Sequence, residues 1–323
     1  MLVTGSSGFL GQRLSKTLSR MGAKVVGIDV REPEEFSFDR LATAPKILRT
    51  KGDVLDGRLL AKTLRKHSIE TVFHLAAQSI VERANENPSG AFDVNVRGTL
   101  AVLEACRNSP SVELVQSSSD HVYGECSDGP ATEDREFRSL YPYDVSKSCA
   151  DMITRSYSVT YGMRAAITRC ANIYGEGDLN WSRVVPGTIR AILEGRIPVI
   201  RSDGEFVRDY IYVEDAVSAY LTLAEKLAAD SDLSGEAFNF SNGHPLKVID
   251  VVNKVSRLMG SYAKPTILNE ASNEIRCLSI SPAKAKRSLG WEARFSMDEG
   301  VERTIRFYEE FLGEQTGKSN RQM

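Results

Sequence analysis

Short apolar segments alternate with amphipathic segments of helical periodicity through the first half of the chain, and this alternation limits the fold more than any other feature. The apolar segments predict strands at Met1–Thr4, Lys24–Ile28, Lys46–Leu48, Thr71–Leu75, Val112–Ser117 and Arg164–Arg169. Helices are predicted between them at Gln12–Met21, Gly57–His67, Ala91–Asn108 and Val145–Tyr161. Repeated βαβ units of this kind build a parallel sheet with helices on both faces. The sequence therefore predicts an α/β fold with a doubly wound parallel sheet.

The pattern loosens after about residue 175, where helices are mixed with short extended pieces. The predicted helices are Val184–Glu194, Val213–Lys226, Val248–Met259 and Met297–Phe311. We expect residues 176–323 to form a smaller α+β part over the carboxyl ends of the strands, which is where ligands of open α/β sheets bind. Residues 1–175 would form the sheet, with some of the later chain crossing back to it.

The composition narrows the choice of partners. The 323 residues carry a formal net charge of −2 and contain no apolar run long enough to span a bilayer. A near-neutral chain has no general attraction to nucleic acid or to anionic membranes, so neither partner is expected. The N-terminal segment enters a strand directly, without a basic or cleavable leader, which indicates a cytoplasmic protein. The cysteines are scattered and odd in number, so we expect reduced thiols and no metal site.

A glycine-rich turn, Gly5-Ser-Ser-Gly-Phe-Leu-Gly11, follows the first predicted strand and opens the first predicted helix. Glycines let a backbone turn tightly and approach a pyrophosphate, and the helix N-terminus offers N–H donors and a partial positive charge. The spacing is Gly-x-x-Gly-x-x-Gly, and its place in a βαβ unit supports a dinucleotide site. The residues expected to contact the cofactor here are Gly5, Ser7, Gly8, Phe9, Leu10 and Gly11.

Asp29 ends the second predicted strand, where a carboxylate can accept hydrogen bonds from both hydroxyls of an adenosine ribose. The same charge would repel a 2′-phosphate, so the sequence favours NAD over NADP, although Arg31 close by weakens this preference. Asp53 and Val54 follow the third strand as predicted adenine contacts. The small residues after the fourth strand, in the run Leu75-Ala76-Ala77, would let the dinucleotide pass.

Tyr143 and Lys147 are four residues apart, so a helix would place them one turn apart on the same face. A neighbouring ammonium stabilises a phenolate, and the tyrosine could then exchange a proton near neutral pH. Ser119, Asp120 and His121 upstream would complete a proton-handling site. Beside a nicotinamide, this group of side chains would act on a carbon–oxygen bond, whereas a Tyr-x-x-x-Lys spacing by itself is more often structural.

These motifs and others further along resemble those of the extended short-chain dehydrogenase/reductases that modify nucleotide-sugars. The resemblance covers nearly the whole chain and rests on separated motifs in the family's order: Gly5–Gly11, Asp29, Asp53-Val54, His74–Ala77, Asn95, Ser118–Gly124, Tyr143–Lys147, Asn172–Gly175, Arg208-Asp209 and Leu289-Gly290-Trp291. It implies a Rossmann sheet with bound NAD, with Tyr143 taking the proton of the sugar 4-hydroxyl. Lys147 would hold the nicotinamide ribose and depress the pKa of the tyrosine. Ser119 would bond the same hydroxyl, and Asn95 would support the active-site backbone.

Members of this family differ in the fate of the 4-keto sugar. Epimerases of the galactose type carry small or neutral residues after the serine, whereas dehydratases carry an acid and then a base, often Glu. This chain has Asp120 as the candidate acid and His121 as the candidate base, which favours a 4,6-dehydratase. The segments around Asn172 and Arg208 resemble most the CDP-glucose and GDP-mannose 4,6-dehydratase-like branch, where a lysine often follows the acid.

The histidine is atypical for both dehydratase patterns, so three other readings stay open. Two of them, a 4-epimerase and a UDP-glucuronate decarboxylase, would use the same scaffold. The third and most remote is a non-catalytic NAD-binding regulatory protein.

The resemblance also implies a nucleotide-diphosphate sugar as the substrate, held by cationic and polar side chains. Guanidinium groups suit its phosphates because their paired donors match phosphate oxygens. The candidates are Ser79, Ser119, Asn172, Arg183, Arg208 and Arg276. Relatives pair the helices at Ala91–Asn108 and Val145–Tyr161 across a twofold axis, which implies a homodimer.

Overall fold

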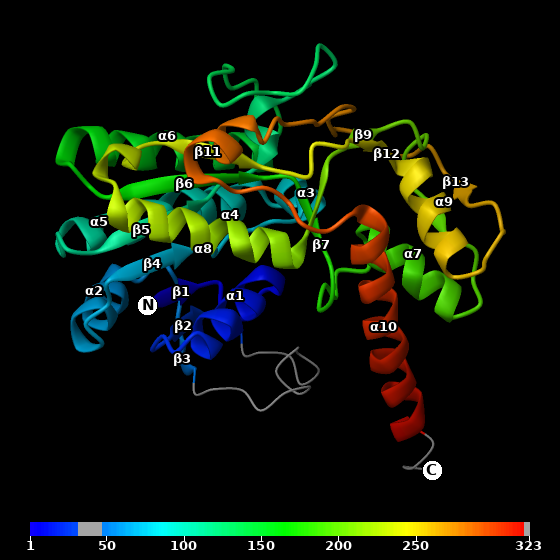
Figure 1. Ribbon diagram of the computed structural model, residues 1–323, viewed down its shortest axis with the longest axis horizontal. Helices are drawn as coiled ribbons and strands as arrows, with labels where there is room; N and C mark the ends of the chain where they lie inside the picture. Colours follow the sequence, from blue (N-terminus) through cyan, green and yellow to red (C-terminus); the bar gives the residue numbers. More distant parts are fainter. Residues whose placement is uncertain (32–46, 320–323) are drawn as a thin grey trace.

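The computed structural model describes residues 1–31 and 47–319. Within these ranges, seven parallel strands form the central sheet in the order β11-β6-β5-β4-β1-β2-β3 (Figure 1). The strands are β1 (Leu2–Thr4), β2 (Val26–Asp29), β3 (Leu48–Lys51), β4 (Thr71–His74), β5 (Glu113–Ser117), β6 (Ala165–Cys170) and β11 (Ala237–Phe240). The predicted doubly wound parallel sheet is confirmed, and its strand order reverses between β1 and β4. Such a reversal opens a ligand crevice beyond the carboxyl ends of the two strands.

Helices cover both faces of the sheet (Figure 1). One face carries α1 (Phe9–Arg20) and α8 (Val213–Ala229), and the other carries α2 (Gly57–Lys66), α5 (Gly98–Arg107) and α6 (Pro142–Tyr161). Successive side chains of a strand point to opposite faces, so Val3 packs with α1 and α8 while Leu2 packs with α2 and α5. Both faces of β1 are therefore buried in apolar cores, as a parallel sheet requires.

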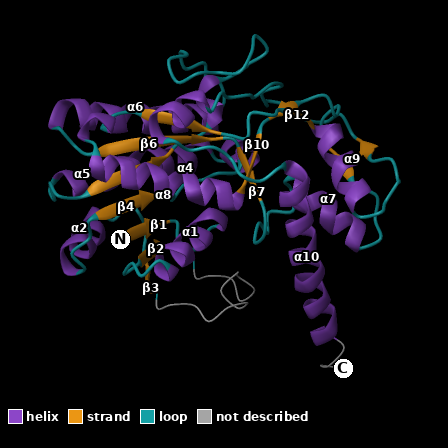
Figure 2. Ribbon diagram, in the orientation of Figure 1, coloured by secondary structure: helices purple, strands orange, loops and turns teal. Residues whose placement is uncertain are grey.

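A smaller part lies beside the sheet, around α7 (Val184–Leu193), α9 (Val248–Leu258) and α10 (Met297–Ser319) (Figure 1). We call it the second lobe. Its short ladders pair β7 (Asn172–Tyr174) with β10 (Tyr210–Tyr212) (Figure 2), β8 (Val199–Ile200) with β13 (Thr266–Ile267), and β9 (Val207–Arg208) with β12 (Leu246–Lys247). The three helices share one core, to which Ile189, Val251 and Val301 belong. Between β10 and β12 the chain returns to the sheet to form α8 and β11.

Short helical segments complete the described chain. They are α3 (Val81–Glu86), α4 (Pro88–Phe92), the π-helical turns η2 (Asp93–Arg97) and η5 (Ala285–Leu289), and the 3₁₀ turns η3 (Asp120–Tyr123) and η4 (Ser231–Leu233). In the part of the chain that the structure describes, no helix combines the length and the apolar character needed to cross a membrane.

The structure differs from the sequence prediction in several elements, and the predicted helix Ala91–Asn108 is divided into α4, η2 and α5. The seventh strand, β11, was not predicted, because four residues among loops carry too little periodicity to be recognised. The third strand is Leu48–Lys51 and not Lys46–Leu48; Lys46 itself lies outside the described residues. As an edge strand it needs few apolar side chains, which hides it in the sequence. The last helix runs to Ser319, beyond the predicted end at Phe311.

Candidate active site

The glycine-rich turn closes tightly at the end of β1, beside the point where the strand order reverses. Gly5 has φ +70°, and a Cβ atom on Gly11 would lie 2.0 Å from the carbonyl oxygen of Gly5. A Cβ on Gly5 would in turn lie 2.8 Å from the backbone nitrogen of Ala76 in the loop after β4. Helix α1 begins directly after Gly8, with no described side chain capping it. Its first N–H groups therefore remain available to an anion such as a pyrophosphate.

The Asp29 carboxylate is fixed beside the glycine-rich turn. One oxygen accepts a hydrogen bond from the backbone N–H of Ser7 (2.9 Å), and the other accepts one from the N–H of Arg31 (3.0 Å). The Nε atom of Arg31 lies 3.9 Å from Asp29 Oδ1. These bonds tie the end of β2 to the glycine turn, so the predicted ribose contact and pyrophosphate contact are held together. The residues present thus fit a dinucleotide.

The loops after β3 and β4 line the rest of the predicted cofactor site. Asp53 accepts a hydrogen bond from the N–H of Leu55, and Val54 is buried against the helical segment that holds Gly98. The run 75–77, which begins with Leu75 and includes Ala77, is half-buried where the turn of Gly5 packs on it.

Asn95 lies inside the π-helical turn η2, where it joins two segments of the site. Its side-chain oxygen accepts from the N–H of Gln78, and its amide nitrogen donates to the carbonyl of Gln78 (3.1 Å) and to the Ser146 hydroxyl (2.8 Å). Ser146 then donates to the carbonyl of Tyr143. A π-helical turn re-aims one side chain inside a helix and is common at functional sites. Here it lets Asn95 bind the loop after β4 to the start of α6.

Tyr143 and Lys147 lie one turn apart on α6 and are both buried. Lys147 donates from Nζ to the carbonyl oxygen of Ser117 at the end of β5 (2.9 Å). Burial lowers the pKa of Lys147 to about 8, and nearby Asp151 opposes this shift. Burial raises the pKa of Tyr143 to about 12, and the hydrogen bond with Ser119 is the main opposing influence. Burial is the largest influence on the Tyr143 pKa, and Lys147 is hydrogen-bonded to a backbone carbonyl, so the expected depression of the tyrosine pKa by Lys147 stays a prediction.

Ser119, Asp120 and His121 follow β5 and lie beside the tyrosine. Ser119 donates to Asp120 Oδ1 (3.1 Å), and the ring of His121 meets the ring of Tyr143 edge to face with centroids 5.2 Å apart. Burial raises the pKa of Asp120 above its ordinary range, while His121, Ser119 and Arg208 oppose the shift. The second oxygen of Asp120 is buried without a hydrogen-bond partner among the described residues. A carboxyl group in this environment is suited to holding and donating a proton.

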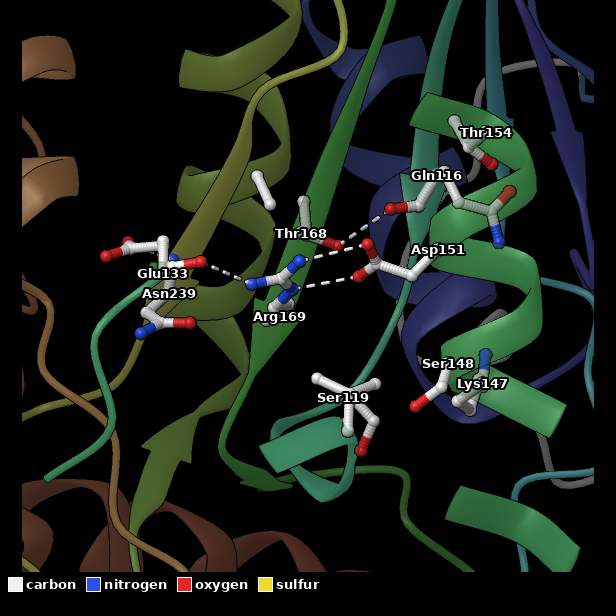
Figure 3. A network of polar contacts seen from close by, with 12 residues as sticks. Gln116, Ser119, Glu133, Lys147, Ser148, Asp151, Thr154, Thr168, Arg169 and Asn239 are labelled. Atoms are coloured by element: carbon white, nitrogen blue, oxygen red, sulfur yellow. Dashed lines mark hydrogen bonds and ion pairs between the residues drawn. The ribbon is translucent and has the colours of Figure 1, made fainter. Parts of the chain in front are cut away.

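A buried ion pair anchors α6 to the sheet one turn beyond Lys147. Arg169 on β6 donates from Nε and Nη2 to the two oxygens of Asp151, at 2.8 and 2.9 Å (Figure 3). Its remaining terminal nitrogen donates to the Tyr123 hydroxyl and to the carbonyl of Glu133. The pair thus fixes the helix that carries the tyrosine and the lysine against the strand beside it.

The predicted substrate residues are spread over the second lobe and the loops that face the sheet. Arg183 precedes α7, pairs with Asp178 (3.1 Å), and lowers the pKa of Tyr143 as a minor influence, which places it near the tyrosine. Asn172 begins β7 and donates weakly to the carbonyl of Asp209 (3.4 Å). Ser79 is exposed in the loop after β4.

Arg208 and Arg276 differ in their surroundings. Arg208 is buried and donates to Glu274 (2.7 Å) and to the carbonyl of Ile275 (2.6 Å). Arg276 is exposed and pairs with Asp203 (2.6 Å). Both guanidinium groups lie over the ring of Phe206. Phe206 also lines a cavity of about 350 Å³ in the second lobe, together with Trp181, Arg183, Val252 and Glu274.

Sequence reasoning missed three contributors to this site. Asp144 is hydrogen-bonded to His121, Ser146 links Asn95 to the carbonyl of Tyr143, and the carbonyl of Ser117 holds Lys147. Asp144 and Ser146 share the helix of the predicted tyrosine, which is the one signal that could have drawn attention to them. Backbone carbonyls leave no signal in a sequence.

Comparison with known proteins gives consistent matches over most of the chain. The model of the NAD dependent epimerase/dehydratase family matches residues 1–240. The dTDP-glucose 4,6-dehydratase of Xanthomonas campestris is 29% identical over 95% of this chain and 92% of its own length. The solved dTDP-glucose 4,6-dehydratase of Bacillus anthracis, in complex with NAD, has a TM-score of 0.87 and 27% identity, covering 96% of both chains. The UDP-glucose 4-epimerase of Thermotoga maritima, solved with UDP-glucose, has a TM-score of 0.86 and 27% identity, covering 96% of this chain and 99% of that one.

Proposed function

Because this chain belongs to the NAD dependent epimerase/dehydratase family, we propose that it is a nucleotide-sugar 4,6-dehydratase. The family predicted from the sequence motifs is confirmed, and with it an enzyme that depends on NAD. The observation that carries the choice of reaction is the buried Ser119-Asp120-His121 turn beside Tyr143. An elimination needs an acid and a base in addition to the tyrosine, and this turn supplies both.

The cofactor site is proposed to use the uncapped N-terminus of α1 for the pyrophosphate and Asp29 for the adenosine ribose. When bound, NAD supplies the acceptor for the hydride of the sugar C4 and the donor that later reduces C6. Asp53, Val54 and the run Leu75–Ala77 are proposed to contact the rest of the dinucleotide. Asn95 is proposed to keep the loop after β4 in place rather than to touch the reacting atoms.

Tyr143 is proposed to take the proton of the sugar 4-hydroxyl as C4 is oxidised. Lys147 lies one turn away and would hold the nicotinamide ribose, and Ser119 would hydrogen-bond the same hydroxyl as the tyrosine. A phenol whose pKa lies near 12 is a weak acid, so the base form must be favoured when substrate and cofactor enter.

Asp120 and His121 are proposed to carry out the elimination. A ketone at C4 acidifies the C5–H bond, and His121 would remove that proton while Asp120 protonates the departing 6-hydroxyl. Burial raises the pKa of Asp120, which favours the protonated form that this step needs. After water has left, His121 would return its proton to C5 as C6 is reduced. The proton that Tyr143 took from the 4-hydroxyl balances the one that Asp120 released.

The second lobe is proposed to bind the nucleotide diphosphate, so that residues 1–175 would hold NAD and residues 176–323 mainly the substrate. The cavity that Trp181, Arg183 and Phe206 line has the size of a small-molecule site and offers both aromatic surface and positive charge. Arg208, Arg276, Asn172 and Ser79 are proposed as further substrate contacts. CDP-glucose or a related nucleotide-hexose is the proposed substrate.

A homodimer is also proposed, through the neighbouring helices α5 and α6. Large apolar side chains are exposed on them, with Leu100 at 40%, Met152 at 61% and Val159 at 76% of their full accessibility. Light scattering of the purified protein should give twice the chain mass. A monomer at micromolar concentration would contradict this part of the proposal.

The function is tested by incubating the purified protein with a panel of nucleotide-hexoses and measuring the molecular masses of the products by mass spectrometry. The product of a dehydratase is lighter than its substrate by the mass of one water, and NAD shows no net reduction. The Asp120→Asn variant should lose product formation by about 10²- to 10⁴-fold while still oxidising C4, because only the acid of the elimination is removed. Asp128→Asn, in the exposed loop that follows, is the matched control. Unchanged dehydration by Asp120→Asn would refute the assignment.

The second candidate is a 4-epimerase, which the likeness to the UDP-glucose 4-epimerase fold supports. It would give a product of unchanged mass. A UDP-glucuronate decarboxylase would instead act on a uronic acid and give a product that is lighter by the mass of carbon dioxide.

A further inference from the structure

His121 and Asp144 form a buried pair that joins two elements of the active site. His121 lies in η3 after β5, and Asp144 lies in the first turn of α6 next to Tyr143. The ring nitrogen Nδ1 is 2.8 Å from Asp144 Oδ1, and the side chains of His121 and Asp144 are only 11% and 1% exposed. An ionised carboxylate only accepts hydrogen bonds, so an ionised Asp144 would hold the proton of this bond on Nδ1.

Asp144 does not cap the backbone N–H groups at the start of α6. Acidic residues in a first turn often accept hydrogen bonds from free backbone N–H groups, but no described N–H donates to Asp144. Its second oxygen, Oδ2, is buried without a partner among the described residues. Burying a half-satisfied carboxylate opposes folding. The arrangement therefore contributes little to stability and instead fixes the imidazole of His121.

We propose that Asp144 is a positioning residue that sets the tautomer of His121. This inference rests on the proposed function. With the proton held on Nδ1, the other nitrogen, Nε2, is the basic one, and no residue that the structure describes hydrogen-bonds it. Asp144 would also stabilise the imidazolium that forms when Nε2 takes the C5 proton of the 4-keto sugar.

The groups already named account for every proton and electron pair that moves in the proposed elimination. The C5–H bond breaks, its proton goes to His121 Nε2, and its electron pair forms the C5–C6 double bond. The C6–O bond breaks and the oxygen leaves as water with the proton of Asp120. The titratable groups that face His121 are Asp144 from α6 and Asp120 from its own turn, and the ring of Tyr143 packs against its edge.

The first test reads the tautomer directly and needs no turnover. Long-range proton–nitrogen correlation spectra of protein labelled at the imidazole nitrogens should show His121 protonated at Nδ1 in the wild type, loaded with NAD. The chain has four histidines, and loss of one signal in His121→Gln assigns it. In Asp144→Asn the Nδ1–H form should no longer dominate. His74, which is buried between Thr4 and Thr99, provides the control signal for an intact fold.

The second test follows the C5 proton. Asp144→Asn should slow solvent-deuterium incorporation at C5, and dehydration with it, by about 10- to 1000-fold, whereas formation of the 4-ketone should persist. Asp144→Glu, which restores a carboxylate, should recover part of the loss.

Different results would overturn the two proposals. A wild-type His121 protonated at Nε2, or unchanged C5 exchange in Asp144→Asn, would refute the role of Asp144 while leaving the dehydratase assignment standing. If the wild-type protein dehydrates no nucleotide-hexose in the panel, the proposed function fails, and the spectra still decide whether Asp144 sets the tautomer.

Discussion

Arg169 and Asp151 form a two-point ion pair in the interior, with side-chain exposures of 6% and 2%. Removing one member leaves the other charge buried and unpaired. We expect Arg169→Met to lower the free energy of unfolding by about 3 to 5 kcal/mol in urea titrations. Arg107→Met, which breaks the exposed Arg107–Glu104 pair, should change it far less. Equal effects of the two variants would contradict the importance of the buried pair.

Gly11→Ala should damage both the fold and cofactor binding. The added Cβ would lie 2.0 Å from the carbonyl of Gly5, a backbone atom that cannot move without opening the turn. We expect a loss of about 1 to 3 kcal/mol in unfolding free energy and a clear loss of NAD binding, measured by calorimetry. Gly57→Ala is the control, because a Cβ there meets nothing within 4 Å. Tight NAD binding by Gly11→Ala would be inconsistent with this description of the turn.

Acid should destabilise the protein partly through His74. Burial is the main cause that lowers the pKa of His74, from 6.5 to about 3, and the positive charge of Lys147 adds to it. The unfolded chain therefore binds more protons than the folded chain between these values, and the unfolding free energy falls as the pH falls through this window. Between about pH 6.5 and about pH 5 the contribution is about 1 to 2 kcal/mol.

The variant His74→Asn removes this titration, so its unfolding free energy should fall less steeply with acid than that of the wild type. His244→Gln alters an exposed histidine and should keep the wild-type slope. Parallel slopes for wild type and His74→Asn in urea titrations at several pH values would show that His74 is not the group responsible.

Asp29 should control the choice between NAD and NADP. Its two oxygens are fixed by the N–H groups of Ser7 and Arg31, and a 2′-phosphate would meet this negative charge. The nucleotide released from denatured wild-type protein should be NAD by mass spectrometry. We expect Asp29→Ala to bind NAD about 10- to 100-fold more weakly and to discriminate less against NADP. Release of NADP from the wild type would contradict the prediction.

The parts of the site that depend on local spacing could be predicted from the sequence. The turn from Gly5 to Gly11, the strand-end Asp29 and the pair Tyr143–Lys147 all follow from neighbours along the chain; the structure joins Asp29 to the turn and places Tyr143 and Lys147 one turn apart on α6. The sheet was predicted for the same reason, since most of its strands alternate with periodic helices.

The contacts between distant segments could not be predicted in this way. His121 meets Asp144 from 23 residues away, and Arg169 meets Asp151 from 18 residues away, because α6 docks on the end of β5 and along β6. The expected effect of Lys147 on the tyrosine pKa also depends on the packed structure. The depth of burial around Tyr143 and the carbonyl that attracts Lys147 are properties of the packed structure.

The route of the chain limits how this protein can be divided or recombined. After the second lobe begins at β7, the chain goes back to supply α8 and β11 to the sheet before α9 and α10 complete the lobe. A protein cut at residue 175 would leave β6 as an open edge and expose the apolar face that α8 covers. Neither half is thus a transferable module. A change of substrate by exchange between relatives would have to graft several separate segments at once.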